Sequence, residues 1–466
     1  MFIGRENELK ELNNRYHNQS SQLVVVYGRR RIGKSQLLKK FCENKKHLFI
    51  EGIEGAHRKL QIENSLKEFA KQSQSPFASK LKLTQWQEFF DLLTEYFKSQ
   101  PNKKIIILDE FQWMANQQSF LVSLIKLYWD NYWKNQNVMM ILCGSVAHFM
   151  VKKVVQSKAL YGRINWELSL TGLPPNKARK MLARRGDFEA LKYLLIFGAI
   201  PKYLEEIDQK QSFDTNLNKL LFQKDGFFVN EIEKIFFSQF KEVQTYKKII
   251  ETLSKKNQSL AEISKKLKIP SGGGLRGYLS NLEKAGFVRA YTSIHQKGYR
   301  SQKYKLFDEY LIFYFKFMQG HQRQISENTK QNLFKLLVTP TWNPWLGIAF
   351  EVFCLKNAMY LAEKAGFAHE VISFAPLFSP KDEKFQIDLI YKRSNKIYTI
   401  CEIKFSETAI NTSIIPEMER KLKLLPHKSS DTIETMLISP FGADQALIQS
   451  QFFHHILSLK EIFEKD

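Results

Sequence analysis

The chain has 466 residues and a formal net charge of +23, with 70 Lys and Arg against 47 Asp and Glu. Hydrophobic residues make up 44% and charged residues 25%, which is typical of folded globular domains and excludes a disordered chain. The length predicts two to four domains, and the charge predicts attraction to a polyanion such as nucleic acid.

The sequence predicts a cytoplasmic protein without a membrane partner. The N-terminus has no signal sequence, and no apolar run reaches the about 20 residues that cross a bilayer. Attraction of the basic surface to a membrane is a weaker alternative, because no basic amphipathic anchor is present. The four cysteines form no C-x-x-C pair, so we expect buried thiols rather than a zinc site or disulfides.

A glycine-rich loop near the N-terminus carries the strongest motif. Leu23 to Val26 predict a buried strand that runs into G-x-x-x-x-G-K-S. In such a loop the backbone N–H groups surround phosphates, the Lys reaches the β- and γ-phosphates, the Ser hydroxyl ligates Mg²⁺, and the following helix N-terminus attracts anions. The predicted ATP site consists of Gly28, Arg29, Arg30, Arg31, Ile32, Gly33, Lys34, Ser35 and Gln36.

The loop is preceded by the opening F-x-G-R-x-x-E-L at residues 2–9, ahead of a predicted helix that ends near His17. This opening is either an amphipathic first helix with a charged start or a segment that packs beside the adenine. After the loop, residues 47–51 predict a second strand and residues 58–99 a mostly helical segment.

The run I-I-I-L-D-E, about 75 residues after the loop, predicts a buried strand with two acids at its C-terminal end. Open α/β sheets bind ligands at that edge. Asp109 is predicted to hold Mg²⁺ through water, and Glu110 is predicted to polarise the attacking water.

Two further residues are candidates for the same site. Val138 to Ser145 predict the next buried strand, where Ser145 either senses the γ-phosphate or caps the next helix. Arg163 in L-Y-G-R is either an ordinary surface arginine or a residue that stabilises transition-state charge.

Residues 241–306 predict a winged helix-turn-helix, with three helices followed by a two-stranded wing that turns near Gly298. This segment has 15 Lys and Arg against four Asp and Glu. DNA binding would place Arg276 in the major groove and Lys297, Arg300 and Lys303 near phosphates. The alternative is a winged helix that only packs against other parts of the protein.

The C-terminal segment carries a second group of acids. A hairpin centred near Asn395 sets Asp388 opposite Glu402, and the two-residue period puts Lys404 on the same face. Asp388 and Glu402 are predicted Mg²⁺ ligands, Glu351 completes the site through water, and Lys404 acts on the water that attacks a phosphodiester. The alternative is a buried ion-pair network without catalysis.

These motifs, with F-G-A-I-P-K-Y-L at residues 197–204, resemble in their order the archaeal-type P-loop ATPases of the STAND/AAA-like class. The resemblance implies an α/β fold: a P-loop core (1–172), a helical lid (173–240), a winged helix (241–306), a helical connector (307–340) and a domain similar to PD-(D/E)xK, or restriction-endonuclease-like, nucleases (341–466). It also implies roles for Asp109, Glu110 and Ser145 in ATP hydrolysis and for Arg163 on the γ-phosphate.

Two functions from different classes fit this sequence. One is an ATPase that engages DNA and carries a metal-dependent nuclease domain, of a defence or mobile-element kind. The other is a signalling ATPase switch whose nuclease-like domain is inactive and which acts through protein partners or by oligomerisation. Cleavage of DNA with Mg²⁺ or Mn²⁺ distinguishes them.

Overall fold

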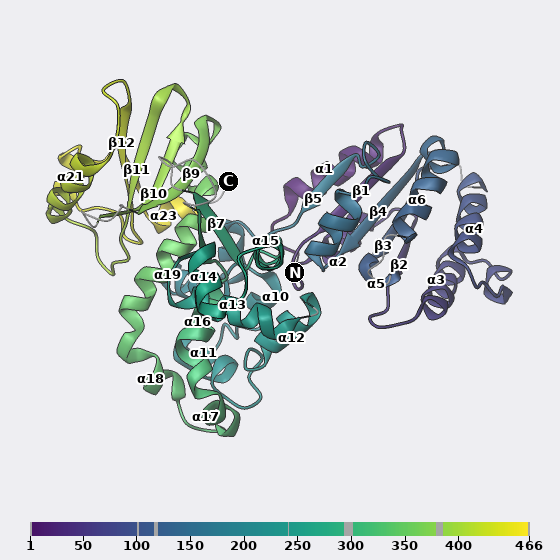
Figure 1. Ribbon diagram of the computed structural model, residues 1–466, viewed down its shortest axis with the longest axis horizontal. Helices are drawn as coiled ribbons and strands as arrows, with labels where there is room; N and C mark the ends of the chain where they lie inside the picture. Colours follow the sequence, from purple (N-terminus) through teal and green to yellow (C-terminus); the bar gives the residue numbers. More distant parts are fainter. Residues whose placement is uncertain are drawn as a thin grey trace. The chain divides into compact units, whose positions relative to one another are not determined.

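The chain divides into two compact units, Met1–Thr171 and Gly172–Asp466. The computed structural model describes residues 2–99, 102–115, 120–240, 242–292, 302–378 and 385–464 (Figure 1). The first unit ends one residue before the predicted end of the P-loop core.

The first unit is built on a five-stranded parallel sheet with the strand order β2-β3-β4-β1-β5. Its strands are β1 (Gln22–Tyr27), β2 (His47–Glu51), β3 (Lys104–Asp109), β4 (Val138–Gly144) and β5 (Trp166–Ser169). The predicted second strand is found with the same bounds, and the other three predicted strands agree within one residue at each end. β5 was not predicted.

Helices cover both faces of this sheet, because alternate residues of each strand point to opposite sides. Val24, Ile105 and Ile141 pack with α1 and α2, whereas Val25, Ile106 and Leu142 pack with α3, α4 and α6. The helices are α1 (Glu6–His17), α2 (Lys34–Cys42), α3 (Arg58–Ser73), α4 (Trp86–Ser99), α5 (Phe111–Met114), α6 (Phe120–Asn131) and α7 (Ala147–Phe149).

The larger of two hydrophobic clusters in the second unit extends from Leu173 to Phe463, and a smaller cluster includes Ile390, Ile400 and Leu437 of the C-terminal sheet. The segments predicted as separate domains therefore share buried contacts. The segment expected as a lid is helical, with α8 (Pro175–Met181), α9 (Asp187–Phe197), α10 (Pro201–Glu205), α11 (Phe213–Leu221) and α12 (Glu231–Gln239).

The F-G-A-I-P motif forms the corner between α9 and α10. Gly198 adopts φ +65° directly after α9, a conformation that side chains disfavour. A Cβ at this position would lie 2.8 Å from Glu309 Oε2, a carboxylate paired with Lys356 at 2.6 Å. Pro201 then occupies the first turn of α10, where its missing N–H costs nothing.

Residues 242–306 form three helices and an antiparallel sheet with the order β6-β8-β7. Ser259 and Glu262 form a capping box at the start of α14, in which each side chain accepts a backbone N–H of the other residue. Lys297, Arg300 and the turn near Gly298 lie outside the described residues. The elements are α13 (Val243–Lys255), β6 (Gln258–Ser259), α14 (Leu260–Leu267), α15 (Gly273–Lys284), β7 (Val288–Thr292) and β8 (Gln302–Leu306).

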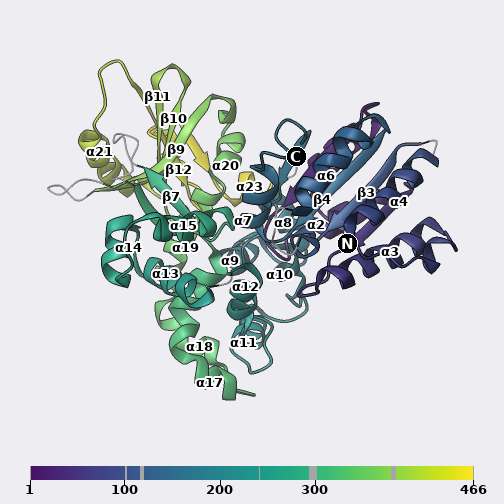
Figure 2. The same cartoon turned by 45° about the vertical axis from the view of Figure 1, so that its right-hand side comes forward.

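The C-terminal part is helical up to residue 364 and then forms a mixed sheet with the order β13-β12-β11-β10-β9, whose inner strands lie side by side in both views (Figures 1 and 2). Its helices are α16 (Glu309–Phe313), α17 (Gln322–Glu327), α18 (Leu333–Leu337), α19 (Trp342–Lys356), α20 (Ala358–Lys364), α21 (Ile415–Leu424), α22 (Gln445–Gln449) and α23 (Leu459–Phe463). Its strands are β9 (Val371–Phe378), β10 (Gln386–Arg393), β11 (Ile397–Ile403), β12 (Thr432–Ile438) and β13 (His455–Leu457).

Two general features were also predicted. All four cysteines are free and buried, as expected. Within the described ranges, no single helix has the length and apolar character to cross a membrane; Leu333–Lys356 and Ala358–Lys364 meet those limits together, but they are bent by 76°.

Candidate functional site

The glycine-rich loop joins β1 to α2 and depends on two glycines. Gly28 approaches the residue that follows β5 so closely that a Cβ would lie 2.3 Å from the Leu170 carbonyl oxygen. Gly33 adopts φ +93° immediately before α2, which begins at Lys34. Both positions therefore require glycine for the loop to fold back onto the helix N-terminus.

The Lys34 side chain is 5% exposed and folds back over the loop. Its Nζ donates to the carbonyl oxygens of Gly28 and Arg29, at 3.0 Å each. The ammonium is thus held within the concave side of the loop, where phosphate oxygens would be stronger, charged acceptors.

The two predicted Mg²⁺ residues lie in direct contact. Ser35 Oγ donates to Asp109 Oδ2 at 2.6 Å, although the two residues are 74 positions apart. Asp109 is 1% exposed, and its other oxygen, Oδ1, accepts the Glu110 backbone N–H at 2.9 Å. The end of β3 therefore fixes the carboxylate beside the loop hydroxyl.

Glu110 and Ser145 also lie in direct contact at the ends of β3 and β4. Ser145 Oγ donates to Glu110 Oε2 at 2.7 Å, and the same carboxylate oxygen accepts a hydrogen bond from the side-chain amide of Gln112. The sequence analysis missed Gln112, and it missed Glu51 at the end of β2, which pairs in register with Asp109. Burial and the charges of Asp109 and Glu110 raise the pKa of Glu51.

The N-terminal motif contacts the loop through Arg5, which is 6% exposed. Its Nη2 donates to the carbonyl oxygens of Thr171 at 2.6 Å and Ile32 at 3.3 Å, and its Nη1 bonds Glu8 at 3.0 Å. Burial lowers the pKa of Arg5, against the attraction of Glu8. The motif thus ties the loop to the last residue of the first unit.

The placement of Arg163 corrects the role that was expected for it. Its guanidinium forms a bidentate ion pair with Asp130, with distances of 2.7 and 2.8 Å, and these hydrogen bonds lower the pKa of Asp130 to about 2. Asn165, two residues on, pairs with Leu23 at the amino end of β1. Arg163 therefore lies at the opposite edge of the sheet from the loop and does not reach a nucleotide bound there.

In the second unit, the structure brings the predicted C-terminal residues together. β10 pairs with β11 in the register that sets Asp388 opposite Glu402. The Glu402 carboxylate is 1% exposed and contacts Lys421 Nζ at 2.6 and 2.9 Å and Lys404 Nζ at 3.0 Å. Asp388 accepts from the Ile403 backbone N–H at 3.3 Å, and burial and Glu402 raise its pKa.

Several lysines lie among the acids of this cluster. Burial and Asp388 raise the pKa of Glu351 to about 7, so Glu351 lies within electrostatic range of the strand acids. Burial lowers the pKa of Lys305, which the charges of Glu351 and Asp388 oppose. Lys305 and Lys421 were not predicted. Lys404 and Lys421 also form ion pairs with Glu417, at 3.4 and 3.2 Å, so three ammonium groups lie among four carboxylates.

The expected metal set of Glu351, Asp388 and Glu402 therefore needs correction. In the part of the chain that the structure describes, no three His, Cys, Asp or Glu side chains are grouped so that they could hold a metal ion. The physical reason is that lysines occupy both oxygens of Glu402. The cluster favours the alternative of an ion-pair network.

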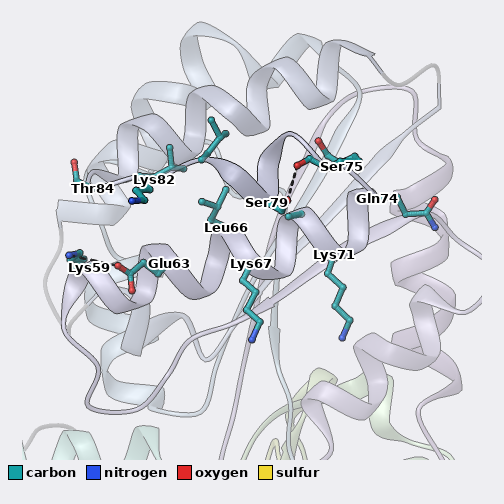
Figure 3. Close-up of a pocket in the computed structure, with 14 residues that line it drawn as sticks. Lys59, Glu63, Leu66, Lys67, Lys71, Gln74, Ser75, Ser79, Lys82 and Thr84 are labelled. Atoms are coloured by element: carbon teal, nitrogen blue, oxygen red, sulfur yellow. Dashed lines mark hydrogen bonds and ion pairs between the residues drawn. The ribbon is translucent and has the colours of Figure 1, made fainter.

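A separate hollow of about 840 Å³ lies between α3 and the segment that follows it (Figure 3). Leu66, Ala70 and Leu81 form part of its apolar lining. Lys67 and Lys71 also line it, and Figure 3 shows their side chains extending from α3 away from Leu66. No residue of the loop or of the strand ends lines it.

The glycine-rich loop, the adjacent hydroxyl and carboxylate, and the parallel sheet define a P-loop nucleotide hydrolase. Residues 2–207 match a family described as an ATPase domain predominantly from Archaea. An uncharacterized protein of Methanocaldococcus jannaschii is 30% identical over 361 residues, which cover 75% of this chain and 76% of that protein. The chain therefore belongs to the same family as that Methanocaldococcus jannaschii protein. The chain is an ATPase.

Two other similarities agree with this assignment. An uncharacterized ATP-binding protein of the same organism is 48% identical over 46 residues, which cover 10% of this chain and 78% of that protein. A Walker-type ATPase of Pyrococcus abyssi matches with a TM-score of 0.51 and 20% identity over 67% of this chain and 96% of that chain. The second similarity concerns the fold alone.

Proposed function

We propose that Lys34 binds the ATP phosphates, that Ser35 and Asp109 hold Mg²⁺, and that Glu110 polarises the attacking water. The contact of 2.6 Å between Ser35 and Asp109 carries this proposal, since it joins a hydroxyl and a carboxylate, the oxygen donors that Mg²⁺ prefers. Mg²⁺ bound there would neutralise charge on the transferred phosphoryl group. Ser145, in contact with Glu110, acts as the sensor of the γ-phosphate.

Glu110→Gln tests this assignment, because it keeps the shape and removes the charge. The variant should bind ATP with wild-type affinity in a calorimetric titration and lose turnover, since only a transition-state interaction is removed. Lys34→Ala should instead lose ATP affinity. Wild-type turnover by Glu110→Gln would contradict the role of Glu110.

The segment 242–306 is proposed to be a winged helix that binds DNA. Support comes from its three helices and antiparallel sheet, its positive charge and the open start of α15. A Cβ at Gly272, Gly273 or Gly274 would meet no atom within 4 Å, so a phosphate backbone can approach this helix N-terminus. Arg276 lies exposed in the first turn of α15.

Salt dependence of DNA binding by the full chain tests this proposal. The logarithm of the binding constant should fall with the logarithm of salt concentration, by about 0.9 per phosphate neutralised. Arg276→Glu should flatten this slope. Lys330→Glu makes the same change of charge outside the segment and should give a steeper slope than Arg276→Glu. Equal slopes for the two variants would indicate that the segment is a packing or partner surface.

For the C-terminal domain, the ion-pair network favours the second function class, a nucleotide-controlled switch with a nuclease-like domain that does not cut. Glu402, held by Lys421 and Lys404, is the observation that supports this choice. Full-length protein should leave plasmid DNA intact with Mg²⁺ or Mn²⁺. Cleavage that disappears in Asp388→Asn while ATP turnover persists would contradict the proposal and establish a nuclease.

A further inference from the structure

Gln112 is a polar side chain that the surrounding core encloses completely. It lies in α5, two residues after Glu110, and is 0% exposed. Its amide nitrogen bonds Glu110 Oε2 and lies 3.3 Å from Ser145 Oγ. A buried amide costs free energy unless its hydrogen bonds are made. The hydrogen bonds that Gln112 makes are to two residues of the candidate site.

The orientation of this amide is fixed from both sides. Its carbonyl oxygen faces Gly144, where a Cβ would lie 2.6 Å away, and has no hydrogen-bond partner within the described part of the chain. Rotation of the amide by half a turn would bring that oxygen against the Glu110 carboxylate and replace an attraction by a repulsion. The amide nitrogen is therefore held toward Glu110, at the cost of an unpaired carbonyl oxygen.

The contacts to Glu110 are confined to one carboxylate oxygen. Gln112 and Ser145 both donate to Oε2, and no described residue donates to Oε1. The backbone of Glu110 adopts φ +48°, a left-handed turn that a non-glycine residue adopts at a cost, and this turn directs its side chain toward the end of β4. One oxygen is thus anchored and the other is left to bind water.

We propose that Gln112 is a positioning residue for ATP hydrolysis: it anchors Oε2 of Glu110 and thereby presents Oε1 to the attacking water. This inference rests on the proposed role of Glu110. Gln112 acts through Glu110 and touches neither nucleotide nor metal. Ser145 supplies the second donor to the same oxygen, so the loss of Gln112 weakens the anchor without abolishing it.

Two substitutions of similar size test the amide itself. Gln112→Met removes the donor and should lower kcat by about 10- to 100-fold, the effect of one hydrogen bond to a charged group. Gln112→Glu places a carboxylate against Glu110 and should lower kcat further. KM and the ATP affinity should remain at wild-type values for both variants. Gln22→Met, which alters another buried glutamine at the amino end of β1, is the matched control and should keep wild-type kcat.

Combination with Glu110→Gln separates this inference from the proposed function. If Gln112 acts through Glu110, adding Gln112→Met to Glu110→Gln should reduce turnover no further. A wild-type or raised kcat for Gln112→Met, beside an inactive Glu110→Gln, would overturn the positioning role alone. Equal losses in both backgrounds would show that Gln112 acts independently of Glu110. Wild-type turnover by Glu110→Gln would overturn the proposed function itself.

Discussion

The ends of β3 and of β11 both carry buried acids, but the partners of those acids differ. Asp109 and Glu110 contact hydroxyl and amide groups, which are neutral, so their negative charge remains available to a cation. Glu402 contacts two lysines, which it shares with Glu417, so its partners are positively charged. We therefore expect the acids at the end of β3, rather than Glu402, to hold a metal ion, and the identity of their partners is a property of the fold.

The largest expected effect is on ATP turnover, from a substitution at the end of β3. Asp109→Asn should lower ATP turnover by roughly 1,000- to 10,000-fold, because the variant loses the charge that holds a metal ion worth several kcal/mol to the transition state. The melting temperature should change little, since the Asn amide oxygen keeps the Glu110 N–H and its NH2 group can donate to the Ser35 hydroxyl. Steady-state hydrolysis and thermal melting measure both effects. Wild-type turnover by Asp109→Asn would contradict the proposed role of Asp109 in binding Mg²⁺.

In the C-terminal cluster, a substitution should lower stability and leave ATP turnover unchanged. Lys421→Met should lower the free energy of unfolding of the second unit by about 3–4 kcal/mol, because it leaves Glu402 buried with only its half-exposed partner Lys404. Adding Glu402→Gln should restore most of this loss. Denaturant unfolding of the full chain measures it, while ATP turnover should persist.

Lys404→Met is the matched control for this measurement. The Lys404 side chain is 37% exposed, so its ion pair is screened by solvent and should contribute less than about 1 kcal/mol. Equal losses for the two lysine variants would indicate that Glu402 is not held by Lys421 in particular.

The raised pKa of Glu351, about 7, makes the second unit sensitive to pH. The folded state binds this proton more tightly than the unfolded chain, so the stabilisation is complete at acid pH and is lost as the pH rises to about 7. The loss should be about 3 kcal/mol. Glu351→Gln should remove this part of the dependence of the unfolding free energy on pH, while Asp388, whose pKa is also raised, keeps its own contribution. Parallel slopes for wild type and variant between pH 5 and 8 would exclude Glu351 as the cause.

The sequence predicted elements whose signal is local. The four strands β1 to β4 have continuous apolar runs, and the hairpin around Asn395 follows from the two-residue period of its strands. β5 has alternately half-exposed and exposed residues over only four positions, which gives no run to detect. Lys421 and Lys305 were missed because they reach the cluster from other elements of the fold, and no local spacing encodes such a contact. Gln112 was missed because a single uncharged glutamine matches no catalytic or phosphate-binding motif.

The smallest effect is expected for Arg163, whose partner lies on the surface. Arg163→Ala removes the ion pair with Asp130, and because the pair is exposed to solvent it should cost at most about 1 kcal/mol of unfolding free energy. ATP turnover at low protein concentration should stay at the wild-type value, since Arg163 lies at the amino edge of the sheet and the loop lies at the other. Hydrolysis measured over a range of protein concentrations checks this. A loss of turnover that grows with concentration would show that Arg163 of one copy reaches the nucleotide of another.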